Sequence, residues 1–235
     1  TSGFNFRTLG DMYAQNPVMN YESTLAGTRT ENGVKDIISE LGAIEAYTIT
    51  SSPDTVFNYA EGIFSSELIV HDIISKSYQK HIYNYSDNFS EEQHLGTKPL
   101  AINDPDGINV SSFPSKQYLK PTVGVDTDQS FNDKFYQYSY GTNKLKLMQA
   151  RKSQLSMLES GLQMSINVVG TTVVKSGDIV EIIIPSISAY KTTKNETKDM
   201  MYNGNFLIRS LRHDFDIGGE KHRMSMNVTK DAMGK

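Results

Sequence analysis

Two histidine–aspartate neighbours are the residues most suggestive of chemistry in this sequence. His71-Asp72 and His213-Asp214 would each supply a base and the carboxylate that orients it, as in a hydrolase triad. Both pairs lie in segments that alternate like β-strands, where successive side chains point to opposite faces. Neither pair can therefore easily make its own catalytic hydrogen bond. No nucleophile elbow, phosphate loop or paired-histidine helix accompanies them, so we expect no catalytic residues and no enzymatic activity.

A turn at residues 104–107 has the Asp-x-Asp-Gly character of a calcium loop. When it is aligned on Gly107, the first and last ligand positions become Ile102 and Phe113, which cannot coordinate calcium. The five histidines show no metal-ligand spacing, and the chain has no cysteine. We therefore expect neither a metal nor a cofactor.

Length and charge exclude several protein classes. A chain of 235 residues can bury a sizeable core without disulfides, and the lack of cysteine suits a reducing cytoplasm. A net charge of −4 argues against a general nucleic-acid binder and against a basic membrane patch. No apolar run reaches membrane-spanning length. The first residue is Thr1, which suggests a processed chain or a piece of a longer protein.

Short apolar bursts between polar stretches predict a mainly β fold with a few helices, of the α+β class. The expected helices are a short one after Asn32 that ends at Gly42, a brief one opened by Ser52-Pro53, and a long one over Asn143–Ser160. The expected strands are Ala43–Thr50, two pieces between Ile63 and Tyr85, then Gln163–Val169, Ile179–Ile184, Asn205–Phe215 and Lys221–Thr229.

Regular patterning stops over residues 86–134. Four of the seven prolines fall there, among many Asn, Asp, Ser and Gly. Structureless stretches of this length are uncommon inside compact domains and usually serve function or partner contact. We expect an irregular inserted arm that becomes ordered against a partner.

The C-terminal strands have one apolar and one polar face. Within β-strand alternation, the predicted core residues are Met164, Ile166, Val168, Met224 and Met226, packed against a helix stripe of Leu147, Met148, Leu155 and Leu158. The opposite face carries Gln163, Ser165, Asn167, Arg223, Ser225 and Asn227. We expect this polar face to meet solvent, a partner subunit or the lumen of a ring.

The order of these elements resembles a known family. The segments Ala150–Leu155, Gln163–Gly170 and Ser176–Ile182, with the ending Phe206–Phe215 and His222–Thr229, resemble the last tube domain of the central baseplate hub protein of T-even-type contractile-tailed phages. This likeness covers Lys144–Met233. Segments Gly3–Leu9 and Gly62–Asp72 resemble parts of marine relatives of that hub.

The resemblance implies a tail-tube-type antiparallel split barrel with a packed helix. The implied domains are residues 1–42 as the end of a preceding domain plus a short helix, 43–85 with 135–235 as the tube domain, and 86–134 as the arm. It also implies a virion protein, assembled in the bacterial host cytoplasm, that has no enzymatic activity. A homotrimeric ring would contact tail tube and spike proteins at the baseplate, with no membrane contact and no specific nucleic-acid binding, although DNA can pass through.

A different class of function also suits a β-rich chain with many aromatic residues. Thirteen tyrosines could stack on sugars in a carbohydrate-binding β module of a phage fibre or a bacterial surface protein. Ring geometry distinguishes the two interpretations, because a hub must close around an axial passage.

Overall fold

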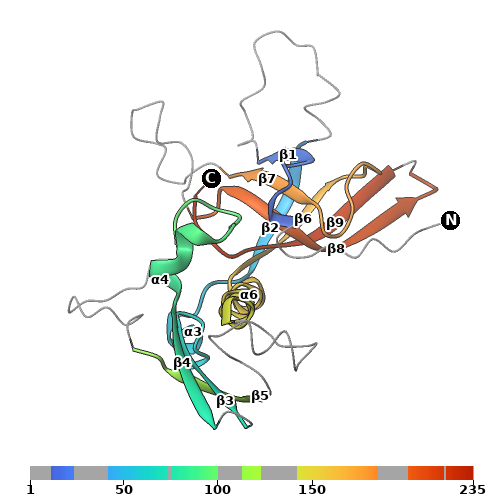
Figure 1. Cartoon of the computed structure of the whole chain (residues 1–235). Coiled ribbons are helices and arrows are strands. Elements are labelled where there is room, and N and C mark those ends of the chain that lie inside the picture. Colours follow the sequence, from blue (N-terminus) through green and yellow to red (C-terminus); the bar gives the residue numbers. More distant parts are fainter. Residues whose placement is uncertain are drawn as a thin grey trace, which may run out of the picture. The chain divides into compact units, whose positions relative to one another are not determined.

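The computed structural model describes residues 12–23, 42–73, 76–99, 113–122, 142–184, 201–219 and 221–234. The chain forms two compact units (Figure 1). The barrel unit comprises residues 1–52, 93–100 and 160–235, and the helix unit comprises residues 53–92 and 101–159. The helix expected after Asn32 and the calcium-like turn at 104–107 lie outside the described residues.

The barrel unit is built on one 6-stranded sheet in the order β1-β7-β8-β9-β6-β2. Its strands are β1 (Met19–Glu22), β2 (Ile44–Ser51), β6 (Leu162–Val169), β7 (Ile179–Ile183), β8 (Gly204–Asp216) and β9 (Lys221–Lys230). All neighbours are antiparallel except β1 and β7, which are parallel. The mainly β fold with helices and an antiparallel split barrel is confirmed.

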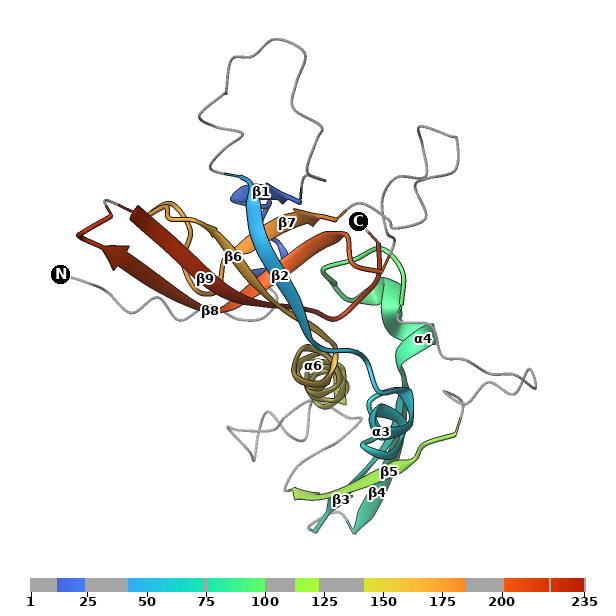
Figure 2. The same ribbon diagram turned by 180° about the vertical axis from the view of Figure 1, so that it is seen from behind.

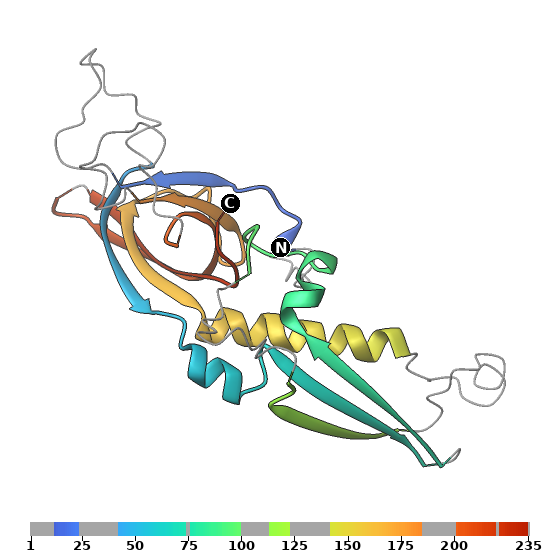
Figure 3. The same cartoon turned by 90° about the vertical axis from the view of Figure 1, so that its left-hand side faces the viewer.

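The two edges of this sheet meet at one end. Glu22, at the end of β1, forms a parallel bridge with Ala43, just before β2. The backbone N–H of Glu22 donates to the carbonyl of Gly42 at 2.8 Å. Figure 3 shows the resulting curl, with the dark blue β1 ending beside the start of the lighter blue β2. The sheet is therefore closed at one end and split along β2.

Side chains on the inner face of the curled sheet form the barrel core. The register of β6 and β9 pairs Met164 with Val228, Ile166 with Met226, and Val168 with Met224. All of these side chains are at most 1% exposed. Strands from around the barrel supply the rest of the cluster, which includes Tyr21, Ile44, Val180, Ile182, Phe206 and Ile208. The predicted core residues of β6 and β9 are confirmed as buried, and they pack on one another across the curl.

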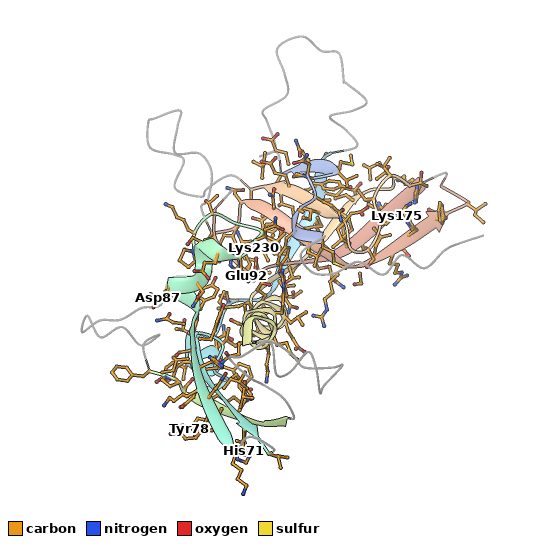
Figure 4. All side chains as sticks on the ribbon, in the orientation of Figure 1. His71, Tyr78, Asp87, Glu92, Lys175 and Lys230 are labelled. Atoms are coloured by element: carbon orange, nitrogen blue, oxygen red, sulfur yellow. The ribbon has the colours of Figure 1, made fainter. Side chains whose placement is uncertain are left out.

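Buried polar groups fasten one part of the barrel. The side chain of Asn203 takes both backbone groups of Ile184, since its Nδ2 donates to the carbonyl at 3.0 Å and its Oδ1 accepts from the N–H. Lys230 is 1% exposed, and its Nζ donates to the carbonyl of Asn203 at 3.0 Å (labelled in Figure 4). The chain on either side of residues 185–200 is thus tied to the C-terminal strand.

Asp231, directly after this strand, binds a second segment of the barrel unit. It accepts a hydrogen bond from Leu95 N–H at 3.0 Å and contacts His94 Nδ1 at 2.9 Å.

The helix unit contains a 3-stranded sheet in the order β4-β3-β5. The strands are β3 (Ser65–Asp72), β4 (Ser77–Asn84) and β5 (Lys116–Thr122), with β3 antiparallel to β4 and parallel to β5. The helices are α3 (Thr55–Ala60), α4 (Tyr85–Asn88), the 3-10 helix η1 (Phe89–Glu91) and α6 (Thr142–Ser160), whose last residue belongs to the barrel unit. Among the described helices, none has the length and apolar character needed to cross a membrane.

The units divide the chain differently from the expected tube domain and arm. The stretch 43–85, expected to be part of the barrel domain, is split after Ser52. The expected arm, 86–134, contains η1 and β5. Pro121 lies within β5, which is an edge strand, where proline is tolerated.

The predicted apolar stripe of α6 is only partly right. Leu158 is buried, but Met148 and Leu155 are 51% and 53% exposed, and the side chain of Leu147 lies outside the described residues. Polar residues are buried instead: Ser153 Oγ donates to the carbonyl of Ile63 at 2.6 Å. The helix faces backbone carbonyls near the start of β3, and buried carbonyls need hydrogen-bond donors. A purely apolar helix stripe would leave these carbonyls without a donor.

Glu67 lies at the centre of the 3-stranded sheet and is 2% exposed. Lys80 Nζ lies 2.5 Å from its Oε1, and Gln117 Nε2 donates to its Oε2 at 2.9 Å. The hydrogen bond from Lys80 lowers the pKa of Glu67 below its ordinary 4.5, although burial acts in the opposite direction. The charged form is therefore the one that the folded sheet favours.

Replacing Glu67 by Gln should make the free energy of unfolding depend less on pH in the acid range. The pKa of Glu67 is lower in the folded than in the unfolded chain. The carboxylate therefore stabilises the fold at pH values above its unfolded pKa, and this stabilisation is lost as the pH falls through its folded pKa. Urea midpoints from about pH 7 to about pH 3 measure this dependence. Glu91→Gln, at an exposed position on η1, is the matched control, because it removes a surface carboxylate and leaves the Glu67–Lys80 pair in place. An unchanged profile in Glu67→Gln would contradict the assignment.

Candidate functional site

The six residues predicted for the polar face lie together on the outer surface of β6 and β9. Their strand neighbours fill the core, so alternation points these side chains away from it. Asn167, Arg223 and Asn227 are exposed, while the other three are half-buried. The register places Ser165 opposite Asn227 and Asn167 opposite Ser225. We call this surface, with the extensions described next, the polar face.

The polar face continues onto both neighbouring strands. Direct partners share a face of a sheet. The register adds Ala46 and Thr48 from β2, and Ser210, Arg212 and Asp214 from β8. Sequence analysis missed the β8 residues because an irregularity between Ile208 and Ser210 shifts the alternation of that strand.

Neutral side chains at the middle of the polar face bond to one another. Ser225 Oγ donates to Asn167 Oδ1 at 2.8 Å. Asn227 Nδ2 donates to Ser210 Oγ at 3.0 Å. These cross-strand pairs satisfy part of the hydrogen-bonding capacity of the surface and hold its side chains in place. The surface is polar without presenting a cluster of unpaired charge at its middle.

Three arginines around the polar face have partners of their own. Arg223 Nε lies 3.3 Å from Glu45 Oε2, and Arg212 lies 2.8 Å from Asp214 Oδ1. Arg209 donates to the amide oxygen of Gln163 at 3.4 Å. Exposed pairs such as these contribute about 0–1 kcal/mol each to stability. Their larger effect is that two of these arginines are already neutralised by carboxylates.

The β2 strand forms the edge of the sheet beside the polar face (Figure 2). An irregularity between Ile44 and Ala46 places Ile44, Tyr47 and Ile49 together on the core side, because they pair with Val168, Ile166 and Met164. Simple alternation along this strand would instead put Ile44 on the same face as Ala46 and Thr48. A bulge reverses the alternation that follows it.

Within the described residues, β2 is a terminal strand of the 6-stranded sheet, and its outer edge pairs with no other strand. Natural edge strands commonly carry lysine, proline or bulges that prevent another strand from adding. The irregularities of β2 lie at its two ends, and the strand has neither lysine nor proline. Tyr47 and Ile49 are 41% and 40% exposed on the core side. An added strand would cover both side chains.

His213 and Asp214 do not pair with each other, and the side chain of Asp72 lies outside those that the structure describes. His213 contacts His222, whereas Asp214 contacts Arg212. His71 is exposed and pairs in register with Tyr78 near the free end of the β3–β4 hairpin (Figure 4). Within the described ranges, no group of three or more His, Asp or Glu side chains could hold a metal ion.

The helix unit contains a pocket of about 230 Å³ with a mostly apolar lining that includes Ile63, Leu68 and Met148. Lys152 Nζ lies 3.7 Å from the centre of the Tyr118 ring, which holds this amine at the pocket by a cation–π contact. The space suits an apolar group of a few atoms.

Solved structures similar to this chain include one of low sequence identity. No protein-family model matches the sequence, and no curated protein matches it. The structure is similar to that of a tail protein from Neisseria meningitidis MC58, with 15% identity and a TM-score of 0.41. The similarity covers 93% of this chain and 46% of that one, so this chain spans less than half the length of that protein.

The two faces of β9 should respond differently to truncation. Replacing Met224 by Ala should lower the free energy of unfolding by about 2–5 kcal/mol, because it leaves a cavity in the barrel core. Replacing its neighbour Ser225 by Ala should change it by only about 0.5 kcal/mol, although the hydrogen bond to Asn167 is lost. Urea titration of both variants provides the comparison. Equal costs at the two positions would show that the assignment of faces is wrong.

Proposed function

We propose that this chain is a structural subunit of the baseplate hub of a contractile phage tail. It would form a ring, as a homotrimer, that joins the tail tube to the central spike, and it would act by assembly without catalysis. The observation that carries the proposal is the unprotected β2 edge beside the polar face. The resemblance of Lys144–Met233 to the last tube domain of phage hubs supports the same function.

The β2 edge offers a physical route to ring formation. A strand from a neighbouring subunit that pairs with β2 would satisfy backbone groups along the edge. It would also cover Tyr47 and Ile49, and each Å² of apolar surface removed from water contributes about 25 cal/mol. The sheet would then continue from one subunit into the next, as the wall of a tube requires.

The polar face suits the inner surface of such a ring. A wall that lets DNA pass should hold phosphates weakly, and phosphate binding grows with each free lysine or arginine. Here Arg212 and Arg223 have carboxylate partners, and serine and asparagine side chains bond to one another. This arrangement supports passage without specific nucleic-acid binding.

Trimer symmetry in the proposed hub would come from two tube domains in each subunit. Three subunits with two such domains each would form a ring of six similar domains, which matches a hexameric tail tube. The same ring has threefold symmetry, which matches a trimeric spike. The barrel unit would be one of these tube domains. On this proposal the protein belongs to the tail baseplate of a virion.

Lysines placed on the β2 edge should weaken assembly. The double variant Tyr47→Lys/Ile49→Lys puts two positive charges where an added strand would otherwise cover apolar side chains. Natural edge strands use lysines in this way to prevent pairing. Sedimentation velocity over a concentration series should show association at least about tenfold weaker, a change of about 1.4 kcal/mol. Val56→Lys, at a position of α3 that is 80% exposed, is the control and should associate like the parent chain.

Urea midpoints of the same variants separate lost assembly from lost folding. Association that is unchanged in the double variant would contradict a role for the β2 edge. A chain that remains monomeric at all concentrations and binds sugars on a glycan array would instead support the carbohydrate-binding interpretation.

A further inference from the structure

The β8–β9 hairpin brings two histidine rings together. His213 pairs in register with Met224, and His222 pairs with Phe215, so both rings lie on the core side of the hairpin. Nδ1 of His213 is 3.0 Å from Nε2 of His222. Both side chains are half-buried. The two residues are nine positions apart, and the hairpin register alone makes them neighbours.

Packing holds the His222 ring in place. Phe215 stacks on it with 4.2 Å between ring centres and 12° between planes. Gly170, the residue directly after β6, lies against the same ring. A Cβ atom added there would come within 2.2 Å of an imidazole carbon. Gly170 N–H also donates to the His222 carbonyl at 2.8 Å. The ring is therefore oriented by its surroundings before any ligand arrives.

The distance between the two nitrogens suits a shared metal ion. Without metal, one ring must donate an N–H to the lone pair of the other. Two imidazole nitrogens bound tetrahedrally to zinc at 2.0–2.1 Å would lie about 3.3 Å apart. Opening the present contact by about 0.3 Å would thus let a cation replace the shared proton.

Nearby carboxylates do not complete a closed ligand set. Asp214 contacts Arg212, on the opposite face of the hairpin. Asp216 Oδ1 accepts from the N–H groups of Gly218 and Gly219 at 3.2 Å each, within the turn. The remaining coordination positions of a metal at the histidine pair would therefore be taken by water.

We propose that His213 and His222 form a two-histidine site for a divalent transition-metal ion, with zinc as the ion to test. Imidazole nitrogen favours Zn²⁺, Cu²⁺ and Ni²⁺, whereas Mg²⁺ and Ca²⁺ prefer oxygen. The site is independent of the proposed assembly function. A bound ion would link β8 to β9 near the turn of the hairpin.

Calorimetric titration of the full chain with Zn²⁺ tests the site. At about pH 7.5 we expect about one ion per chain, and at about pH 5.5 much weaker binding, because protons compete for imidazole nitrogens. His213→Gln and His222→Gln should each weaken Zn²⁺ binding at least about tenfold, since each removes one of two ligands. His71→Gln, at an exposed position of β3, should bind like the parent chain. Mg²⁺ should give no comparable heat.

An NMR titration of the unmodified chain keeps the test valid if a variant fails to fold. Zn²⁺ should shift the ring signals of His213 and His222 together and leave those of His71 in place. Absence of binding would overturn the proposal, as would binding that shifts other histidines or survives both substitutions.

Discussion

The pairing of β6 with β9 fixes which side chains of these two strands face the barrel core. Its register sets Met164, Ile166 and Val168 against Val228, Met226 and Met224. Because side chains alternate along a strand, a slip of one residue would exchange the apolar and polar faces. That exchange would expose methionines and bury serine and asparagine, so the burial of the core stabilises this one register. The polar face is a consequence of the same pairing.

Three further features of the barrel unit are built outward from this central pair. The sheet curls around the core until Glu22 reaches Ala43, which closes one end of the barrel. Beyond that bridge, β2 keeps an edge with exposed Tyr47 and Ile49. On the other side of β9, the long partner strand β8 extends the core face to the His213–His222 contact. Assembly through β2 and metal binding at the hairpin would thus use different parts of one sheet.

The sequence predicted the local elements of the C-terminal part well. Strict alternation located β6 and β9 to within a residue or two. The same alternation grouped the polar side chains correctly on β6 and β9. These features depend on neighbours in the chain, which periodicity reports directly.

Features that depend on distant neighbours could not be predicted in this way. The parallel partners β1 with β7 and β3 with β5 join segments far apart in the chain. The buried Ser153 of α6 looks like a surface residue until the carbonyl of Ile63 is placed beside it. The bulge after Ile44 and the nearness of the two histidines likewise depend on register, which no spacing rule reveals.

The most direct test of the ring account is electron cryo-microscopy of tails that contain this chain. The account predicts a ring at the baseplate in which β2 of each copy pairs with a strand of its neighbour. In that ring Ser165, Asn167, Ser225 and Asn227 should line the central channel. A chain found as a separate decoration of the tail, with β2 open to solvent and the polar face turned outward, would contradict it.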